Sequence, residues 1–293
     1  MSWLVPLLLR VVVAQVVAPT LQKILAATHG REERFLLQFV AATVIAIGVG
    51  MWSGATLNQW TFVAAGLGAL SALGAYCQWR AMHLSLSRYA LCTWMDDLSA
   101  MFLGWAVLGE GRFFNGLLVA GILLAFGVTI TLLIRDCRRK TDKRIESTMA
   151  FVLWVAGFSA TYGVVVFSIR ALALRDVMDI GSFVVGWYPG ATSVGVIILL
   201  RKRMIKGLDV LTLRDVWFSV ALGAVIVAAL AAHVWVLQLA PIIATQAIFL
   251  IAETTLPGLI GLYFFNEKKD LALVDYGFFA LGLVAVLMIA LSL

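Results

Sequence analysis

Two adjacent carboxylates interrupt an apolar stretch between residues 91 and 110. They are Asp96 and Asp97, and a third acid, Glu253, lies in a similar apolar stretch near the end of the chain. A carboxylate at the centre of a membrane helix costs about 2.5–3.5 kcal/mol on insertion scales, so acids there usually face the protein interior and serve ion or proton pathways. Asp96 and Glu253 are therefore our first candidates for binding a substrate cation or for proton coupling, and Asp97 is the next.

A structural role is the alternative for each acid. An aspartate in this stretch could pair with a basic residue such as Arg80 or Arg88 and only hold two helices together. Glu253 is followed four residues later by Pro257, which has no N–H to donate to the Glu253 carbonyl. A free carbonyl beside a carboxylate suits a cation or a proton, whereas the alternative is a proline kink that serves packing alone.

The elements that hold these acids must be membrane-spanning helices. The chain has 293 residues, of which 62% are hydrophobic and 13% charged, and its mean hydropathy is +1.00. A soluble domain needs more polar surface than this, whereas apolar runs of about 20 residues match the thickness of a bilayer. The sequence predicts ten such helices, at 3–25, 35–52, 60–81, 85–108, 115–134, 148–171, 180–200, 216–239, 242–265 and 271–293.

Positive charge is concentrated in alternate connections between these spans. The odd-numbered loops contain most of the 22 Lys and Arg residues, and the longest polar break, 135–147, is one of them. Because basic residues accumulate in cytoplasmic loops, this bias predicts that both termini lie outside the cytoplasm. We expect no nucleic-acid partner, since there is no soluble basic face to bind one.

The two halves of the chain resemble each other. Asp96 is followed fourteen residues later by Glu110, and Glu253 is followed fourteen residues later by Glu267. In the first span of each half, Gln15 and Lys23 are separated by the same distance in sequence as Tyr162 and Arg170. Because each half contains five predicted spans, the second half must enter the membrane from the opposite side. We therefore predict an all-α polytopic membrane protein of two inverted five-helix repeats, 1–134 and 148–293, joined by a basic loop at 135–147.

These repeats resemble the drug/metabolite transporter (DMT) superfamily of the EamA type. The resemblance rests on an apolar span that ends in "GE" or "NE" in each half and is followed by a glycine-containing final span. It implies ten helices around a central cavity, lined largely by the third, fourth, eighth and ninth spans, and transport by alternating access. Two features depart from the family pattern. Asp97 and Thr254 stand where a proline is usual, and the family orientation places both termini inside.

The resemblance adds candidates on the spans that would line the cavity. Gln78 and Gln246 carry amides that need a partner at membrane depth, and Trp79 and Trp235 could enclose a cationic or ring-bearing substrate. Packing against lipid or other helices is the alternative for each tryptophan. Glu110 and Glu267 each end a span, and we interpret both as structural residues at helix ends.

The functional expectation is a secondary transporter of a small organic metabolite or drug-like solute, driven by a gradient, with proton coupling as an option. The alternatives are a flippase of a lipid-linked head group and an intramembrane lipid-modifying enzyme. We expect no enzymatic activity, cofactor or metal, because no P-loop, HExxH motif or credible catalytic triad is present. We further expect a monomer or homodimer in a bacterial cytoplasmic (inner) membrane, whose partners are the bilayer and a small-molecule substrate.

Overall fold

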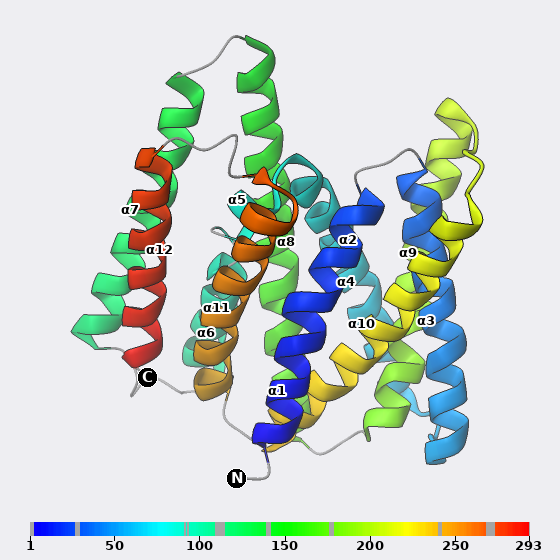
Figure 1. Cartoon of the computed structure of the whole chain (residues 1–293). Coiled ribbons are helices and arrows are strands. Elements are labelled where there is room, and N and C mark those ends of the chain that lie inside the picture. The colour runs from blue at the N-terminus through cyan, green and yellow to red at the C-terminus, as the bar shows by residue number, and fades with distance from the viewer. Residues whose placement is uncertain are drawn as a thin grey trace.

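Helices account for the regular structure of this chain. The computed structural model describes residues 3–26, 30–90, 92, 94–108, 115–138, 142–175, 179–239, 242–267 and 273–292, and within these ranges it contains helices and no strands (Figure 1). In chain order the helices are α1 (Leu4–Val12), η1 (Val13–Val17), α2 (Ala18–Ala26), α3 (Arg31–Ser53), α4 (Gln59–Leu84), α5 (Leu86–Ala90), α6 (Trp94–Leu108), α7 (Gly116–Arg138), α8 (Asp142–Leu174), α9 (Ile180–Lys206), α10 (Leu213–Leu239), α11 (Ile242–Leu259), η3 (Ile260–Phe264) and α12 (Leu273–Leu291).

Several of these helices are long and apolar enough to cross a bilayer. In the described part of the chain there are six, namely Leu4–Ala26, Arg31–Ser53, Gln59–Leu84, Met149–Leu174, Ile180–Ile205 and Leu213–Leu239. Shorter apolar helices occupy Gly116–Val128, Ile248–Phe264 and Tyr276–Ile289. A helix of about 20 apolar residues spans the hydrocarbon core. The protein is therefore an all-helical, polytopic integral membrane protein, and the ten-span count stays a prediction.

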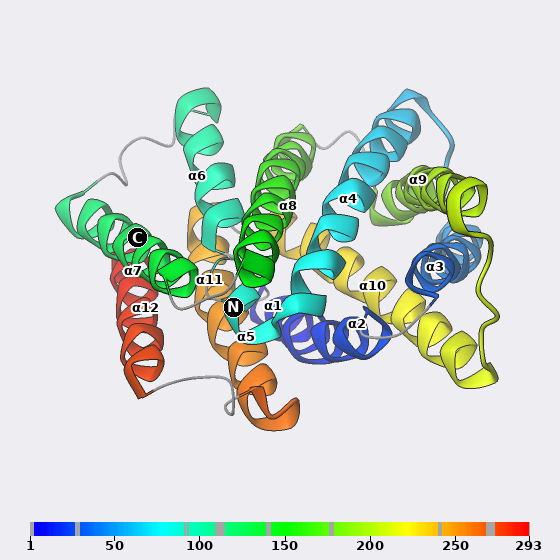
Figure 2. The ribbon, with the colours of Figure 1, turned by 90° about the horizontal axis from the view of Figure 1, so that it is seen from above.

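The helices form a bundle with two flanking pairs. Helices α3 and α9 pack together on one side, and α7 and α12 pack together on the other (Figure 2). Between these pairs lie α1, α2, α4, α8, α10 and α11, which surround the middle of the protein (Figure 2). The start of α1 and the end of α12 lie at the same end of the bundle (Figure 1).

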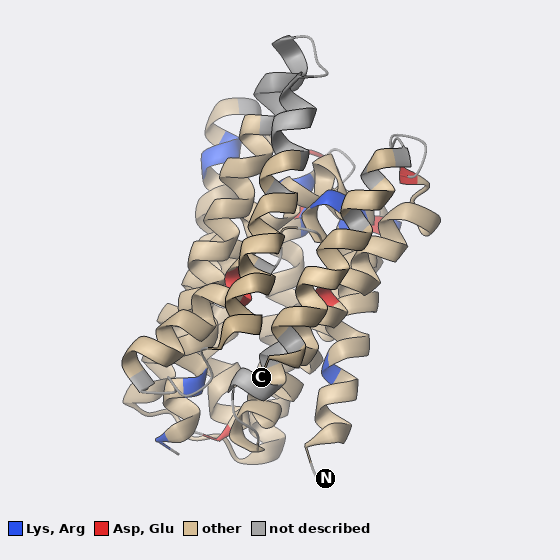
Figure 3. Cartoon of the chain, turned by 90° about the vertical axis from the view of Figure 1, so that its left-hand side faces the viewer, with Lys and Arg blue, Asp and Glu red and all other residues tan. Residues whose placement is uncertain are grey.

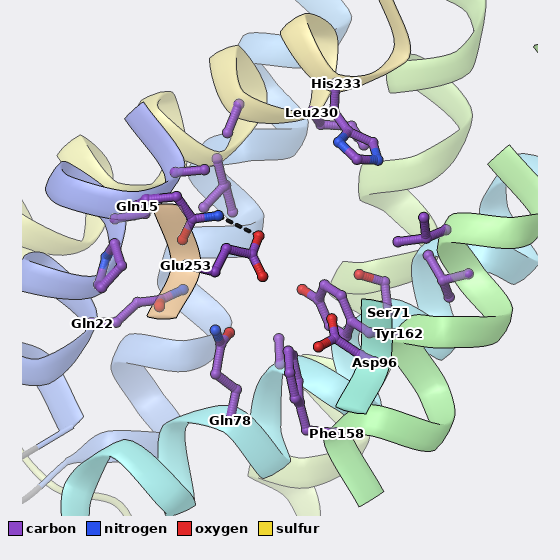
Figure 4. A pocket seen from close by; sticks show the side chains of 18 of the residues that line it. Gln15, Gln22, Ser71, Gln78, Asp96, Phe158, Tyr162, Leu230, His233 and Glu253 are labelled. Carbon is purple, nitrogen blue, oxygen red and sulfur yellow. Dashed lines mark hydrogen bonds between the residues drawn. The ribbon is translucent and has the colours of Figure 1, made fainter. Parts of the chain in front are cut away.

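The first span contains a π-helical segment, η1, between α1 and α2. Pro19 lies four residues after Gln15 and has no N–H to donate to the Gln15 carbonyl, so the regular hydrogen-bond ladder cannot continue there. A π-type turn is a common way to absorb such a break, and it often lies at a functional site. The side chain of Gln15 is buried, and it faces the centre of the bundle (Figure 4).

The fourth predicted span is not the single helix that the sequence indicated for 85–108. Helix α5 ends at Ala90 and α6 begins at Trp94, with Cys92 in a turn between them. Asp96 and Asp97 consequently lie in the first turn of α6 rather than in mid-helix. Carboxylates are favourable there because the N–H groups of the first turn have no partner within the helix and carry partial positive charge.

Glycines allow α4 and α9 to approach each other at backbone distance. A Cβ atom at Gly68 would collide with the backbone of Trp187, and one at Gly190 would collide with the backbone of Ala65. Small residues at such positions let membrane helices pack closely where lipid provides no hydrophobic driving force. The glycines of α4 and α9 therefore serve helix packing.

The N-terminus of α9 is capped by an acid just outside the membrane segment. The Asp179 carboxylate accepts hydrogen bonds from the Ser182 N–H at 2.8 Å and from the Ser182 hydroxyl at 2.6 Å. Burial opposes the ionisation of Asp179, but these hydrogen bonds outweigh it and hold the pKa of Asp179 below the usual aspartate value. The cap fixes where α9 begins.

Candidate functional site

A cavity of about 170 Å³ lies in the middle of the bundle. One water molecule needs about 10–15 Å³, so the volume of this cavity is more than enough for a single water. Its walls come from the first span and from α3, α4, α5, α6, α8, α9, α10 and α11, so segments from both halves of the chain meet around it (Figure 4). The cavity thus has the size and the central position expected for a small-solute site.

Three carboxylic acids meet at this cavity. Asp96 and Asp97 come from the first turn of α6 and Glu253 comes from α11, and one carboxylate oxygen from each lies within 4.8 Å of the others. Asp96 is 5% exposed and Asp97 is 4% exposed. Acidic residues accordingly appear at mid-height of the bundle, far from either end (Figure 3). The structure therefore brings together the three acids that the sequence ranked first.

Glu253 is held by two residues from the first span. Gln15 donates a side-chain hydrogen bond to Glu253 Oε1, and Arg10 Nη2 lies 3.6 Å from the same oxygen (Figure 4). Among the described residues that line the cavity, Arg10 is the only lysine or arginine, and it faces three acids. In a low-dielectric cavity this imbalance has to be met by protons or by a bound cation.

The Arg10 side chain is fixed from its other side as well. Its Nε donates to His233 Nδ1 at 3.3 Å, and its guanidinium lies 5.1 Å from the centre of the Phe249 ring. His233 also stacks on Phe249, with ring centroids 5.5 Å apart and an interplanar angle of 29°. The guanidinium is therefore clamped between a carboxylate, an imidazole and an aromatic face, which leaves it little freedom to leave the cavity wall.

Aromatic residues form the opposite wall. Gln78 donates from Nε2 to the Tyr89 hydroxyl at 2.9 Å, and both residues line the cavity. The Tyr89 ring lies edge-on to Phe158 at 5.5 Å, and Phe158 lies 4.6 Å from Tyr162. Tyr162 and Phe158 lie next to Asp96 (Figure 4). This wall can present ring faces to a bound group next to the aspartates.

The other sequence candidates lie elsewhere. Trp79 is fully buried in the packed core, edge-on to Phe35 at 5.4 Å, and Trp235 is 43% exposed on the outside of α10. Neither tryptophan lines the cavity. The helices that carry them are apolar on several faces, so the sequence alone did not predict whether these rings face the cavity, the core or the lipid. The side chain of Gln246 lies outside the described part of the structure.

The first-span residues of the site were missed by the sequence prediction. Arg10 and Gln15 belong to a span that the family resemblance does not place at the cavity, and the scattered histidines gave no reason to select His233. A signal was nevertheless present, because Gln15 stands four residues before Pro19 just as Glu253 stands four residues before Pro257. The alternative pairing of the aspartates with Arg80 is not seen, since the Arg80 guanidinium lies over the Trp154 ring at 5.0 Å.

Glu267 has structural contacts, as the sequence indicated. It pairs with Lys23 at 3.0 Å and accepts hydrogen bonds from the Ser85 hydroxyl and the Leu86 N–H, each at 3.0 Å. Lys23 also donates to the Met82 carbonyl at 2.7 Å. We name Lys23, Glu267 and these three groups the end clamp, because they join α2, the end of α4, α5 and the residues after η3. Glu110 lies outside the described residues.

Comparisons with known proteins identify the fold alone. No protein-family model matches the chain, and no curated protein matches it. One solved structure, described only as "Crystal structure of protein", is similar to it with a TM-score of 0.61 and 16% sequence identity, over 98% of this chain and 97% of the other. At this identity the similarity shows that the two chains share an overall fold along nearly their whole length.

Proposed function

We propose that this integral membrane protein is a secondary transporter that moves a small organic solute by alternating access, in the manner of the DMT superfamily that its sequence resembles. The observation that carries the proposal is the central cavity, in which acids from α6 and α11 meet residues of the first span. Transporters of this general design bind their substrate and coupling ion near the membrane midplane, between two structural repeats. A bacterial cytoplasmic membrane is the proposed location.

Reciprocal helix contacts support the inverted repeat that the proposal requires. Helix α4 packs against α9 and α8, and α10, its counterpart in the second half, packs against α3 and the first span. Helix α6 packs against α8, and α11 correspondingly packs against α1 and η1. One polar contact within each half is also equivalent. Lys23 of the first span donates to the carbonyl of Met82 in α4, and Arg170 of α8 donates to the carbonyl of Leu237 in α10, both at 2.7 Å.

Interrupted helices at the cavity are a second support. The turn between α5 and α6 places Asp96 and Asp97 at a helix start deep in the bundle, and the π-helical segment η3 follows the α11 stretch that contains Glu253 and Pro257. Discontinuous helices supply free backbone groups to substrate and ion sites in many transporters. In Figure 1 the start of α1 and the end of α12 lie at the same end of the bundle. This agrees with a chain that crosses the membrane an even number of times.

Proton coupling follows from the charge imbalance at the cavity. Three acids and one guanidinium are balanced either by protons on the carboxyl groups or by a cationic group of the solute. If the two alternatives exclude each other, a proton leaves when the cationic group arrives. We therefore propose exchange of a solute for protons at Asp96, Asp97 and Glu253.

Reconstitution into liposomes tests the proposal. Purified protein in sealed vesicles, with a proton gradient imposed in either direction, is offered radiolabelled amines, amino acids, organic acids, nucleosides and sugars. We expect at least one class to accumulate well above protein-free vesicles, and Trp235→Leu to preserve that activity as the matched control. If folded protein moves none of these solutes, a transporter of this kind is excluded. Transfer of lipid head groups in the same vesicles would instead indicate a flippase.

A further inference from the structure

Polar atoms without a protein partner gather on the walls of the central cavity. Within the described part of the chain, several buried side-chain atoms have no hydrogen-bond partner, and more than half of them belong to residues that line the cavity: Arg10 Nη1, Gln38 Oε1, His233 Nε2, Asp96 Oδ1 and Asp97 Oδ2. Because nearly all buried polar atoms in folded proteins are hydrogen-bonded, such a concentration around one cavity indicates that a ligand or water supplies the missing partners.

Four of these atoms, on Arg10, His233, Asp96 and Asp97, form a donor pole and an acceptor pole. Arg10 Nε donates to His233 Nδ1, so the ring nitrogen that carries hydrogen in the neutral imidazole is Nε2. The donor pole is therefore Arg10 Nη1–H together with His233 Nε2–H. The acceptor pole is Asp96 Oδ1 together with Asp97 Oδ2. His233 is 6% exposed, so neither of its nitrogens is supplied with partners by bulk solvent.

Glu253 lies between the two poles. Its carboxylate is within 4.8 Å of the aspartate oxygens and 3.6 Å from Arg10 Nη2, so Glu253 is close to a member of each pole. Glu253 already accepts from Gln15 and pairs with Arg10. It therefore fixes the donor pole in place and leaves the aspartates as the acids available to a ligand.

We propose that the cavity binds a zwitterionic solute, with its ammonium group at Asp96 and Asp97 and its carboxylate at Arg10 Nη1 and His233 Nε2. A simple cation would leave the donor pole without a partner, and a simple anion would leave the acceptor pole without one; either omission is costly for buried groups. Because a zwitterion adds no net charge, protons on the carboxyl groups still balance the excess of acids over Arg10. The ring faces of Phe158 and Tyr162 beside Asp96 suit an ammonium group. That this zwitterion is transported rests on the proposed function, but its binding does not.

Equilibrium binding to the purified protein in detergent tests the inference without requiring transport. The probes are L-leucine, isopentylamine, which lacks the carboxylate, and 4-methylpentanoate, which lacks the amine. A series of ω-amino acids from glycine to 6-aminohexanoate measures the separation of the poles. We expect at least one zwitterion to bind, and its single-ended analogues to bind about tenfold or more weakly, the equivalent of one charged hydrogen bond.

Two variants separate the poles. Asp96→Asn should weaken the zwitterion and the amine but leave the carboxylate analogue unchanged. His233→Phe, which keeps a ring against Phe249, should weaken the zwitterion and the carboxylate analogue but leave the amine unchanged. A merely structural role would weaken all probes alike in both variants.

Three results would overturn the proposal: binding of no probe, equal affinity of the amine and the zwitterion, or parallel losses in the two variants. Probes that bind as expected but never cross vesicles would refute the transporter while leaving the zwitterion site intact. Transport of other solutes, without competition by any zwitterion, would refute the zwitterion site while leaving the transporter intact.

Discussion

The end clamp gives a stability prediction that can be worked from its geometry. In Lys23→Met the ammonium is lost from the Met82 carbonyl, 2.7 Å away, and from Glu267, 3.0 Å away. The side chains of Lys23 and Glu267 are 11% and 13% exposed, so solvent compensates little. Removing one partner of a buried pair costs about 3–5 kcal/mol. Because Glu267 keeps two other donors, we expect the lower end, about 3 kcal/mol.

The assay is reversible unfolding in mixed micelles of increasing denaturing-detergent fraction, followed by circular dichroism. Glu267→Gln should cost less than Lys23→Met, because the glutamine oxygen can still accept from the Leu86 N–H while its amide nitrogen donates to the Ser85 hydroxyl. The double variant should be more stable than the sum of the single losses predicts, since the two side chains interact directly. Arg203→Met removes an exposed charge of the same bundle and serves as the control. If Lys23→Met unfolds like Arg203→Met, the pair contributes nothing and the reasoning fails.

Three further sets of variants test helix packing and helix capping. Gly190→Ala should reduce folded yield sharply because its methyl group meets the α4 backbone, whereas Gly66→Ala, which has open space, should be neutral or more stable by up to about 1 kcal/mol; equal yields would contradict the close approach. Trp79→Ala should cost about 3–5 kcal/mol of unfolding free energy, while Trp235→Leu should cost little. Asp179→Ala should cost about 1 kcal/mol at neutral pH. Because the folded state lowers the pKa of Asp179, this difference should vanish as the pH falls through that pKa, and a pH-independent difference would refute the cap.

Much of the membrane fold could be read from local sequence. Apolar runs of bilayer length determined where helices lie, and an acid is costly enough in such a run that Asp96, Asp97 and Glu253 were singled out. The spacing shared by the two halves pairs Asp96 with Glu253 in the sequence alone. These inferences needed only the solvation of single residues and the chain's internal similarity.

What the sequence could not supply was long-range packing and local breaks. Arg10 reaches Glu253 only because the first span packs against α10 and α11, and no local pattern encodes that contact. The interruption between α5 and α6 contains no proline or glycine, so propensity favoured a continuous helix. Trp79 was a cavity candidate because the family resemblance places the third span at the cavity, with packing as the alternative. A helix that is apolar on most faces does not reveal which side is buried, so the sequence could not decide between them.

Solute exchange by acid variants tests the central claim most directly. Vesicles preloaded with a transported solute are given a trace of the labelled form outside, and counterflow is measured for the wild type, Asp96→Asn and Glu253→Gln, each shown by unfolding to be intact. If the cavity is the transport site, both variants should lose counterflow or its response to a proton gradient by about tenfold or more. If both folded variants showed the same counterflow as the wild type, with the same dependence on the proton gradient, the assignment of the cavity to transport would be contradicted.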